Sequence, residues 1–346
     1  MRSGCYTALV TPFTADGSQV DAESLGQLIE FQIENNITGI LAVGTTGESP
    51  TLAWDEHHQV VARAAQAAKG KCLCIAGTGS NNTRESLAAT EHAAKQGVDG
   101  VLLVDPYYNG PSSLEIRREY VAPVAQAHPE LDIIPYIIPG RTGAQMMPED
   151  LALLYKAYPN VNTVKEATGD LNNMRRTREC CGSDFTILSG DDALLVKMMT
   201  DKTIAAAGVI SVASNIAPGA MTALATALET GQTAKAEKLA GELEPLFSLV
   251  TVTTQEATQF GEVACRARNP LAIKTLMALL GMPTGPCRRP LGKMTRKGLD
   301  HVVSVARQVQ SHNPEILQPI ADFFGVDINE RLDNPEYQQG LYYESY

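Results

Sequence analysis

The sequence predicts an α/β fold, a single (β/α)8 TIM barrel followed by a C-terminal helical region. Short apolar runs alternate eight times with helical stretches, a pattern typical of parallel strands joined by helices. The first expected strand runs into Thr11-Pro12-Phe13, which lacks the glycine fingerprint of an open dinucleotide-binding sheet. A barrel needs about 250 residues, and the chain has 346. A closed barrel is therefore favoured over an open sheet.

The expected elements follow in order along the chain. Strands are expected at residues 6–10, 39–43, 72–76, 100–104, 133–136, 161–165, 185–188 and 206–211. Helices of the barrel are expected at residues 22–34, 54–68, 83–96, 114–127, 148–158, 171–180 and 193–199. Asp21 suits an N-cap and Pro148 a first helical turn. Beyond the eighth strand the sequence is expected to be helical at 220–229, 233–249, 271–280 and 296–309.

These elements divide the chain into three parts. Residues 1–218 are expected to form the barrel, 219–309 the C-terminal helices, and 310–346 an acidic tail of unknown role. The tail carries one basic and seven acidic residues, so it holds more than half of the net charge of -11. Its apolar patch from Ile316 to Phe324 fits packing on this chain or on another subunit, and its acidity also fits a flexible extension.

Composition excludes several classes of function. The acidic balance argues against a nucleic-acid partner, which would need a basic face. No apolar run approaches the roughly 20 residues that span a bilayer, and the N-terminus does not resemble a signal peptide. The seven cysteines have no zinc-site spacing and are expected to be reduced. We therefore expect a cytoplasmic protein, or an organelle stroma protein if a transit peptide has been removed.

Lys165 is the most informative residue at the C-terminal ends of the strands, where barrels carry their chemistry. It closes the apolar run 161–164 and should point into the barrel mouth. Burial there would lower its pKa and free the amine to attack a carbonyl. The alternative is an ion pair with Glu166 or with an aspartate at the barrel top.

Other polar residues are expected at the same face. Thr45 and Thr46 lie in a glycine-flanked turn that can hold a carboxylate or cap the next helix. Tyr108 and Tyr136 can relay protons or simply pack. Arg141 can clamp a carboxylate or form a surface ion pair. Their convergence on one face is what favours a site.

Six segments together resemble the dihydrodipicolinate synthase family in order and spacing, over about residues 3–307. They are GTTGESPTL (44–52), GTGSN (77–81), PYYNGPS (106–112), GRTG (140–143), VKEATGD (164–170) and LSGDD (188–192). GTTGE and the lysine segment alone mark only the wider pyruvate-lyase superfamily, which includes N-acetylneuraminate lyase. The resemblance implies condensation of pyruvate with aspartate semialdehyde, on the route to lysine and diaminopimelate, without a metal or organic cofactor.

The resemblance also implies roles for the residues at the strand ends. The implied catalytic residues are Lys165 for the imine with pyruvate, Tyr136 for proton transfer, and Thr45, which links Tyr136 to Tyr108 of a neighbouring subunit. The implied substrate-binding residues are Thr46 for the pyruvate carboxylate, Gly190 and Ile210 through their carbonyls, and Arg141 for the aspartate semialdehyde carboxylate. The family is commonly a homotetramer built as a dimer of dimers, and the shared tyrosine requires at least a dimer.

Arg141 favours aspartate semialdehyde, because sugar-acid lyases of the superfamily generally lack an arginine there. Ile137 departs from the asparagine that is usual in the family, which would remove a polar group near the pocket. One alternative is another class I pyruvate lyase or aldolase acting on a sugar acid or hydroxy-keto acid. The other is a non-enzymatic barrel that serves as a binding or scaffold protein, which would require a degraded site.

Feedback inhibition by lysine is implied as well. In lysine-inhibited relatives an allosteric pocket at a subunit interface uses residues that match Trp54, His57, Asn81, Glu85 and Tyr107. An aromatic wall and a carboxylate suit the stem and the ammonium group of lysine. The alternative is a packed tryptophan with solvated helix residues, and Pro50 departs from the usual alanine.

Overall fold

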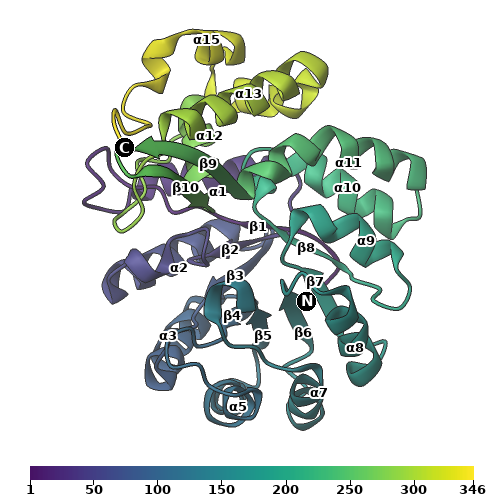
Figure 1. The fold of residues 1–346 in the computed structure, drawn as a ribbon. Coiled ribbons are helices and arrows are strands. Elements are labelled where there is room, and N and C mark those ends of the chain that lie inside the picture. The colour runs from purple at the N-terminus through teal and green to yellow at the C-terminus, as the bar shows by residue number, and fades with distance from the viewer.

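The computed structural model describes all 346 residues and contains a closed barrel of eight parallel strands in sequence order (Figure 1). The strands are β1 (Gly4–Ala8), β2 (Gly39–Ala42), β3 (Leu73–Gly77), β4 (Gly100–Val104), β5 (Asp132–Ile137), β6 (Thr163–Glu166), β7 (Thr186–Ser189) and β8 (Gly208–Ser211). The predicted barrel is confirmed, and each predicted strand overlaps the observed one with its ends displaced by a few residues at most.

Helices surround the barrel, as predicted. They are α1 (Ala22–Glu34), α2 (Trp54–Ala68), α3 (Thr83–Gln96), α5 (Ala122–Ala127), α7 (Pro148–Ala157), α8 (Leu171–Cys181), α9 (Leu195–Thr200) and α10 (Pro218–Glu229). The Asp21 carboxylate accepts from the backbone N–H groups of Glu23 and Ser24, so the predicted cap is confirmed. Pro148 lies in the first turn of α7, also as predicted.

The helix predicted over 114–127 is confirmed, but its centre is π-helical and not α-helical. A short α4 (Ser113–Glu115) leads into a π-helical turn, η2 (Ile116–Val121), before α5 begins. Pro123 explains the change, because proline has no N–H and its ring clashes with the carbonyl four residues earlier. That carbonyl, on Glu119, instead accepts from the hydroxyl of Thr83 over 2.8 Å.

Two hydrophobic layers form because side chains alternate across each strand. One set fills the barrel interior and includes Tyr6, Leu41, Ile75, Tyr136 and Ile210. The other set, much larger, fills the space between the strands and the surrounding helices. The barrel is therefore a packed core with its polar residues left for the mouth.

The C-terminal region contains a β-hairpin that the sequence analysis missed. Between α11 (Thr233–Phe247) and α12 (Leu271–Leu279), strands β9 (Thr251–Thr258) and β10 (Gly261–Arg268) pair in antiparallel register. In Figure 1 the hairpin lies between the barrel and the helices α12 and α13 (Arg296–His312). The region is thus not purely helical, because an alternating, threonine-rich run favours extended backbone.

The acidic tail packs on its own chain. It contains η6 (Pro314–Ile316), α14 (Gln318–Phe324), α15 (Ile328–Asp333) and η7 (Pro335–Gln338). The rings of Phe323 and Phe324 lie 5.5 and 5.3 Å from that of Phe31 in α1. Arg331 donates to the carbonyls of Ala278 and Leu279, and so caps the C-terminal end of α12.

Two further expectations can be compared with the structure. No helix has both the length and the apolar character to cross a membrane. All seven cysteines are free thiols, as expected for a chain with a large core of its own.

Candidate active site

Lys165 lies near the end of β6 with only 4% of its surface exposed. Its neighbour in the register of β5 is Tyr136, and its Nζ lies 4.2 Å from the centre of that ring. The lysine forms no ion pair. Glu166 accepts hydrogen bonds from Asn173 and Thr168 instead, which contradicts the alternative that it pairs with the lysine. Lys165 is thus a buried, unpaired amine at the barrel mouth.

The pKa of Lys165 is lowered to about 7, chiefly by burial; the charge of Asp192 opposes this shift, and the charge of Arg141 adds to it. Asp192 is buried and accepts from the backbone N–H groups of Val212 and Ala213, at 3.0 and 2.9 Å. The sequence analysis gave Asp192 no role, although it follows β7 at the same face. At neutral pH about half of the lysine amines are uncharged, which is the form that attacks a carbonyl.

Tyr136 and Thr45 face the same cavity. Burial raises the pKa of Tyr136 to about 12, whereas the Arg141 charge and a hydrogen bond with Thr45 oppose that rise. Tyr108 is 87% exposed and does not line the cavity, whereas Tyr107 does. One chain therefore brings Tyr136 and Thr45 together, and leaves Tyr108 projecting from the rim.

Asn269 connects the two residues expected to bind carboxylates. Its side-chain amide donates to the hydroxyl of Thr46 over 2.9 Å, and Thr46 is buried. Its backbone carbonyl accepts from Arg141 Nη2 over 3.1 Å. Sequence reasoning missed Asn269, because it follows the unpredicted strand β10 and lies more than 200 positions from Thr46.

Gly190 directly follows β7, and Ile210 lies on β8. A Cβ added at Gly190 would lie 2.7 Å from the Ala167 Cβ and 3.2 Å from the Lys165 Cε. Glycine is therefore needed here because a Cβ would clash with Ala167, and it would also press on the lysine side chain. Ile210 is buried in the barrel interior with Tyr136.

The loop that carries Thr45 and Thr46 is strained and externally anchored. Val43 and Glu48 adopt left-handed φ values of 51° and 55°, which are costly for residues with a Cβ. Gly77 lets the Val43 backbone approach, because a Cβ there would lie 2.5 Å from the Val43 oxygen. The Glu48 carboxylate is held 2.8 Å from the ammonium of Lys274 on α12, and both side chains are buried. The sequence analysis gave Lys274 no role.

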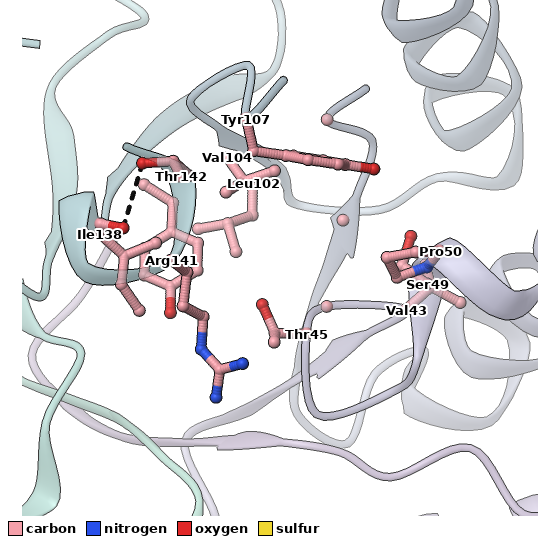
Figure 2. A pocket seen from close by; sticks show the side chains of 14 residues that line it. Val43, Thr45, Ser49, Pro50, Leu102, Val104, Tyr107, Ile138, Arg141 and Thr142 are labelled. Carbon is pink, nitrogen blue, oxygen red and sulfur yellow. Dashed lines mark hydrogen bonds between the residues drawn. The ribbon is translucent and has the colours of Figure 1, made fainter. Parts of the chain in front are cut away.

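A cavity of about 210 Å³ lies at the mouth beside Thr45, Tyr136 and Arg141. Its lining is Val43, Gly44, Thr45, Ser49, Pro50, Gly77, Gly79, Leu102, Val104, Tyr107, Tyr136, Ile138, Arg141 and Thr142. Lys165 is not in this lining and borders the cavity only through the ring of Tyr136, whose centre lies 4.2 Å from the lysine Nζ. Figure 2 shows Arg141 reaching toward Thr45 on one side, and Tyr107 extending toward Ser49 and Pro50 on the other. The expectation that Ile137 changes the pocket is wrong, because this side chain packs between the strands and the helices.

Of the residues expected to bind lysine, Tyr107 lines this cavity. Asn81 Oδ1 accepts from the backbone N–H of Tyr107 over 2.7 Å, and the Glu85 carboxylate accepts from the Ser80 hydroxyl. The rings of Trp54 and His57 are 5.1 Å apart.

His57 is the buried member of that group. Burial lowers its pKa to about 4, so it is neutral at pH 7. Its Nε2 lies 2.9 Å from the carbonyl oxygen of Gly77, which lines the cavity. Through this contact the expected lysine site adjoins the mouth.

Known proteins match this chain over most of its length. The family model for the Dihydrodipicolinate synthetase family matches residues 1–309. The 4-hydroxy-tetrahydrodipicolinate synthase of Nitratidesulfovibrio vulgaris is 39% identical over 289 residues, which are 84% of this chain and 92% of that protein.

Solved structures of such synthases have a fold similar to that of this chain. The 4-hydroxy-tetrahydrodipicolinate synthase of Methylacidiphilum fumariolicum SolV has a TM-score of 0.82 at 34% identity, covering 94% of this chain and 100% of that one. The dihydrodipicolinate synthase of Cyanidioschyzon merolae, solved with lysine bound, has a TM-score of 0.79 at 35% identity, covering 89% and 97%.

Proposed function

The chain belongs to the Dihydrodipicolinate synthetase family, and from this premise we propose how its own residues perform the reaction. The protein is a lyase that condenses pyruvate with L-aspartate 4-semialdehyde to 4-hydroxy-tetrahydrodipicolinate, in lysine and diaminopimelate biosynthesis. The observation that carries the proposal is the buried Lys165 amine, whose pKa is about 7, against the ring of Tyr136.

Lys165 begins the reaction as a nucleophile. Its uncharged amine adds to the keto carbon of pyruvate, and loss of water leaves a protonated imine. Tyr136 donates a proton to the departing oxygen and recovers it later. The imine is the electron sink of the reaction, so no metal or organic cofactor is required.

Carbon–carbon bond formation follows. The iminium acidifies the pyruvate methyl group, and loss of a methyl proton gives an enamine that attacks the aldehyde carbon of aspartate semialdehyde. The aldehyde oxygen takes up a proton through Tyr136 and Thr45, with Tyr108 of a second copy completing the relay. The amino group of the substrate then attacks the imine carbon, which closes the ring and releases Lys165 as the free amine.

Four residues bind the reactants in this scheme. Thr46, whose hydroxyl accepts from Asn269, holds the pyruvate carboxylate. Gly190 and Ile210 border the imine through their backbone carbonyls. Arg141, which is half-buried and has no acidic partner, holds the aldehyde's carboxylate.

Trapping with borohydride tests the imine. Pyruvate and borohydride together should add one reduced pyruvate to the intact mass, on the peptide that carries Lys165. A Lys165→Ala protein should show no adduct, and an adduct on another residue would reject the assignment. A non-enzymatic scaffold would give no adduct at all.

The second candidate activity is another pyruvate lyase, acting on a sugar acid or hydroxy-keto acid. The unpaired guanidinium of Arg141 favours a carboxylate near the aldehyde over a hydroxylated chain. Turnover of pyruvate with aspartate semialdehyde, compared with N-acetylmannosamine, separates the two activities. Faster turnover of the sugar would overturn the proposed substrate.

Lysine is the proposed feedback inhibitor. The Glu85 carboxylate would take the lysine ammonium group, and Trp54, which is 39% exposed, would cover the stem. The other proposed contacts are His57, Asn81 and Tyr107. Tyr107 lines the same cavity as Arg141. A lysine bound against Tyr107 would therefore change the shape of the cavity that the substrates enter. An assay in which millimolar lysine fails to inhibit would reject this site.

Assembly and location complete the proposal. Tyr108 completes no site in its own chain, which supports a homo-oligomer of at least two copies, and we propose a tetramer built from dimers. Its neighbour Tyr107 is 42% exposed, so the rim offers two tyrosines for contact with a second copy. We further propose that the enzyme is cytoplasmic. Sedimentation at assay concentrations tests the assembly, and a monomer with full activity would contradict it.

A further inference from the structure

The hairpin of β9 and β10 ends at the active site. Arg268 is the last residue of β10, and the next residue, Asn269, contacts both Thr46 and Arg141. The proposed reaction scheme gives this strand no part beyond that contact. Its position still brings any side chain near its end close to the mouth.

Arg141 and Arg268 each donate a hydrogen bond to the backbone next to the other, where β10 meets the mouth. Arg268 Nη2 donates to the Gly140 carbonyl over 3.1 Å, and Arg141 Nη2 donates to the Asn269 carbonyl over 3.1 Å. Each guanidinium therefore binds the backbone beside the other arginine. Arg266 lies two residues before Arg268 and so shares its face of the strand.

These arginines have no acidic partners. None of Arg141, Arg266 and Arg268 forms an ion pair, in a chain whose net charge is -11. Burial lowers the pKa of Arg141, and the charges of Arg268 and Arg266 lower it further. Like charges held together without a counter-charge raise the energy of the free protein. An anion bound among them would relieve that repulsion.

We propose that Arg268 is a second arginine of the site that holds the aldehyde's carboxylate, with Arg266 behind it at the rim. The inference rests on the proposed function and assigns a further residue to it. A carboxylate has two oxygens with about four lone-pair positions, so Arg141 can occupy one edge while Arg268 takes a remaining one. Arg268 donates one hydrogen bond within the chain and keeps its other N–H groups for the ligand.

The inference predicts an effect on one substrate only. Arg268→Gln should raise KM for aspartate semialdehyde about tenfold or more, as expected when a hydrogen bond to a charged group is lost. KM for pyruvate and kcat should stay within about twofold, because the imine site holds Thr46 and Lys165 and not this side chain. Arg266→Gln, at an exposed position, should give a smaller rise in the same KM.

A matched aldehyde distinguishes binding from scaffolding. 3-Aminopropanal is aspartate semialdehyde without its carboxylate, so Arg268→Gln should leave its kcat/KM with the pyruvate enzyme unchanged. Arg268→Lys keeps the charge and should recover part of the loss with aspartate semialdehyde. Arg296→Gln, at an exposed side chain in the first turn of α13, is the control for general loss of positive charge.

Two outcomes would overturn the inference. One is an unchanged KM for aspartate semialdehyde in both Arg268→Gln and Arg266→Gln. The other is an equal loss with both aldehydes, which would make Arg268 a tether of the hairpin only. Borohydride trapping of pyruvate on the same variants keeps the two proposals apart, since a normal adduct at Lys165 leaves the proposed function standing.

Discussion

The rate at which the enzyme captures pyruvate should depend on pH with an inflection near 7. Burial lowers the pKa of Lys165 to about 7, whereas an ordinary lysine has a pKa of about 10.4. At pH 7 about half of the amines are then uncharged, against roughly one in 2,500 for an exposed lysine. Burial of Lys165 thus raises the fraction of uncharged, reactive amine at pH 7 roughly a thousandfold.

Rapid mixing with pyruvate, quenching at set times and reduction to a stable adduct would give the rate of imine formation across pH 5.5 to 9.5. The rate should rise tenfold per pH unit below 7 and level off above it. A rate that keeps rising tenfold per unit up to pH 9 would refute the reasoning, because the amine would then behave as a solvated one. Two variants move the inflection in known directions. Arg141→Gln should raise it, and Asp192→Asn should lower it.

The same pKa implies a cost in stability. Between pH 7 and 10.5 the unfolded chain binds more protons at Lys165 than the folded one, so stability rises with pH across that window. Lys165→Met should therefore stabilise the protein most below pH 7, by at most about 5 kcal/mol. The advantage should vanish above pH 10.5, where both states are uncharged. Urea unfolding of both proteins at pH 6 and pH 10 measures the difference.

Three further predictions follow from single contacts. Lys274→Met leaves the Glu48 carboxylate buried without its cation and should lower the free energy of unfolding in urea by roughly 3–5 kcal/mol. Adding Glu48→Gln should recover part of that loss. A loss below about 1 kcal/mol would mean that the ion pair does not anchor the loop. Gly190→Ala crowds the reactive lysine and should lower kcat/KM for pyruvate roughly a hundredfold, whereas Gly26→Ala, which meets open space, should not. Glu85→Gln should raise the lysine concentration for half-inhibition about tenfold without changing uninhibited turnover, and equal inhibition of both proteins would contradict the proposed site.

Much of the fold could be predicted because periodic patterns are local. The strands and most helices follow from apolar periodicity, and α1 begins where Asp21 caps it. The interrupted helix before β5 shows the limit of such patterns. Pro123 was a visible signal, but its effect depends on Thr83, about 40 positions earlier, taking the freed carbonyl.

The convergence of the proposed catalytic and substrate-binding residues was predictable for a different reason. Barrel topology brings the C-terminal ends of all strands to one face, so Lys165, Tyr136 and Arg141 converge without any knowledge of packing. Asn269 and Lys274 lie outside that rule, because they reach the site from the C-terminal region. The hairpin was missed although the threonine-rich run of β9 favours extended backbone, since its mostly exposed strands carry few apolar residues.

Lys274 and Asn269 contact the loop from Val43 to Glu48 from outside the barrel strands. The loop from Val43 to Glu48 has two strained residues, and strain persists only when its surroundings fix it. Lys274 supplies that constraint through the buried Glu48, and Asn269 orients the hydroxyl of Thr46. Residues from both sides of the boundary expected at residue 218 therefore meet at the mouth. The barrel carries Lys165, the proposed nucleophile, and residues of the C-terminal region hold Glu48, Thr46 and Arg141 in place.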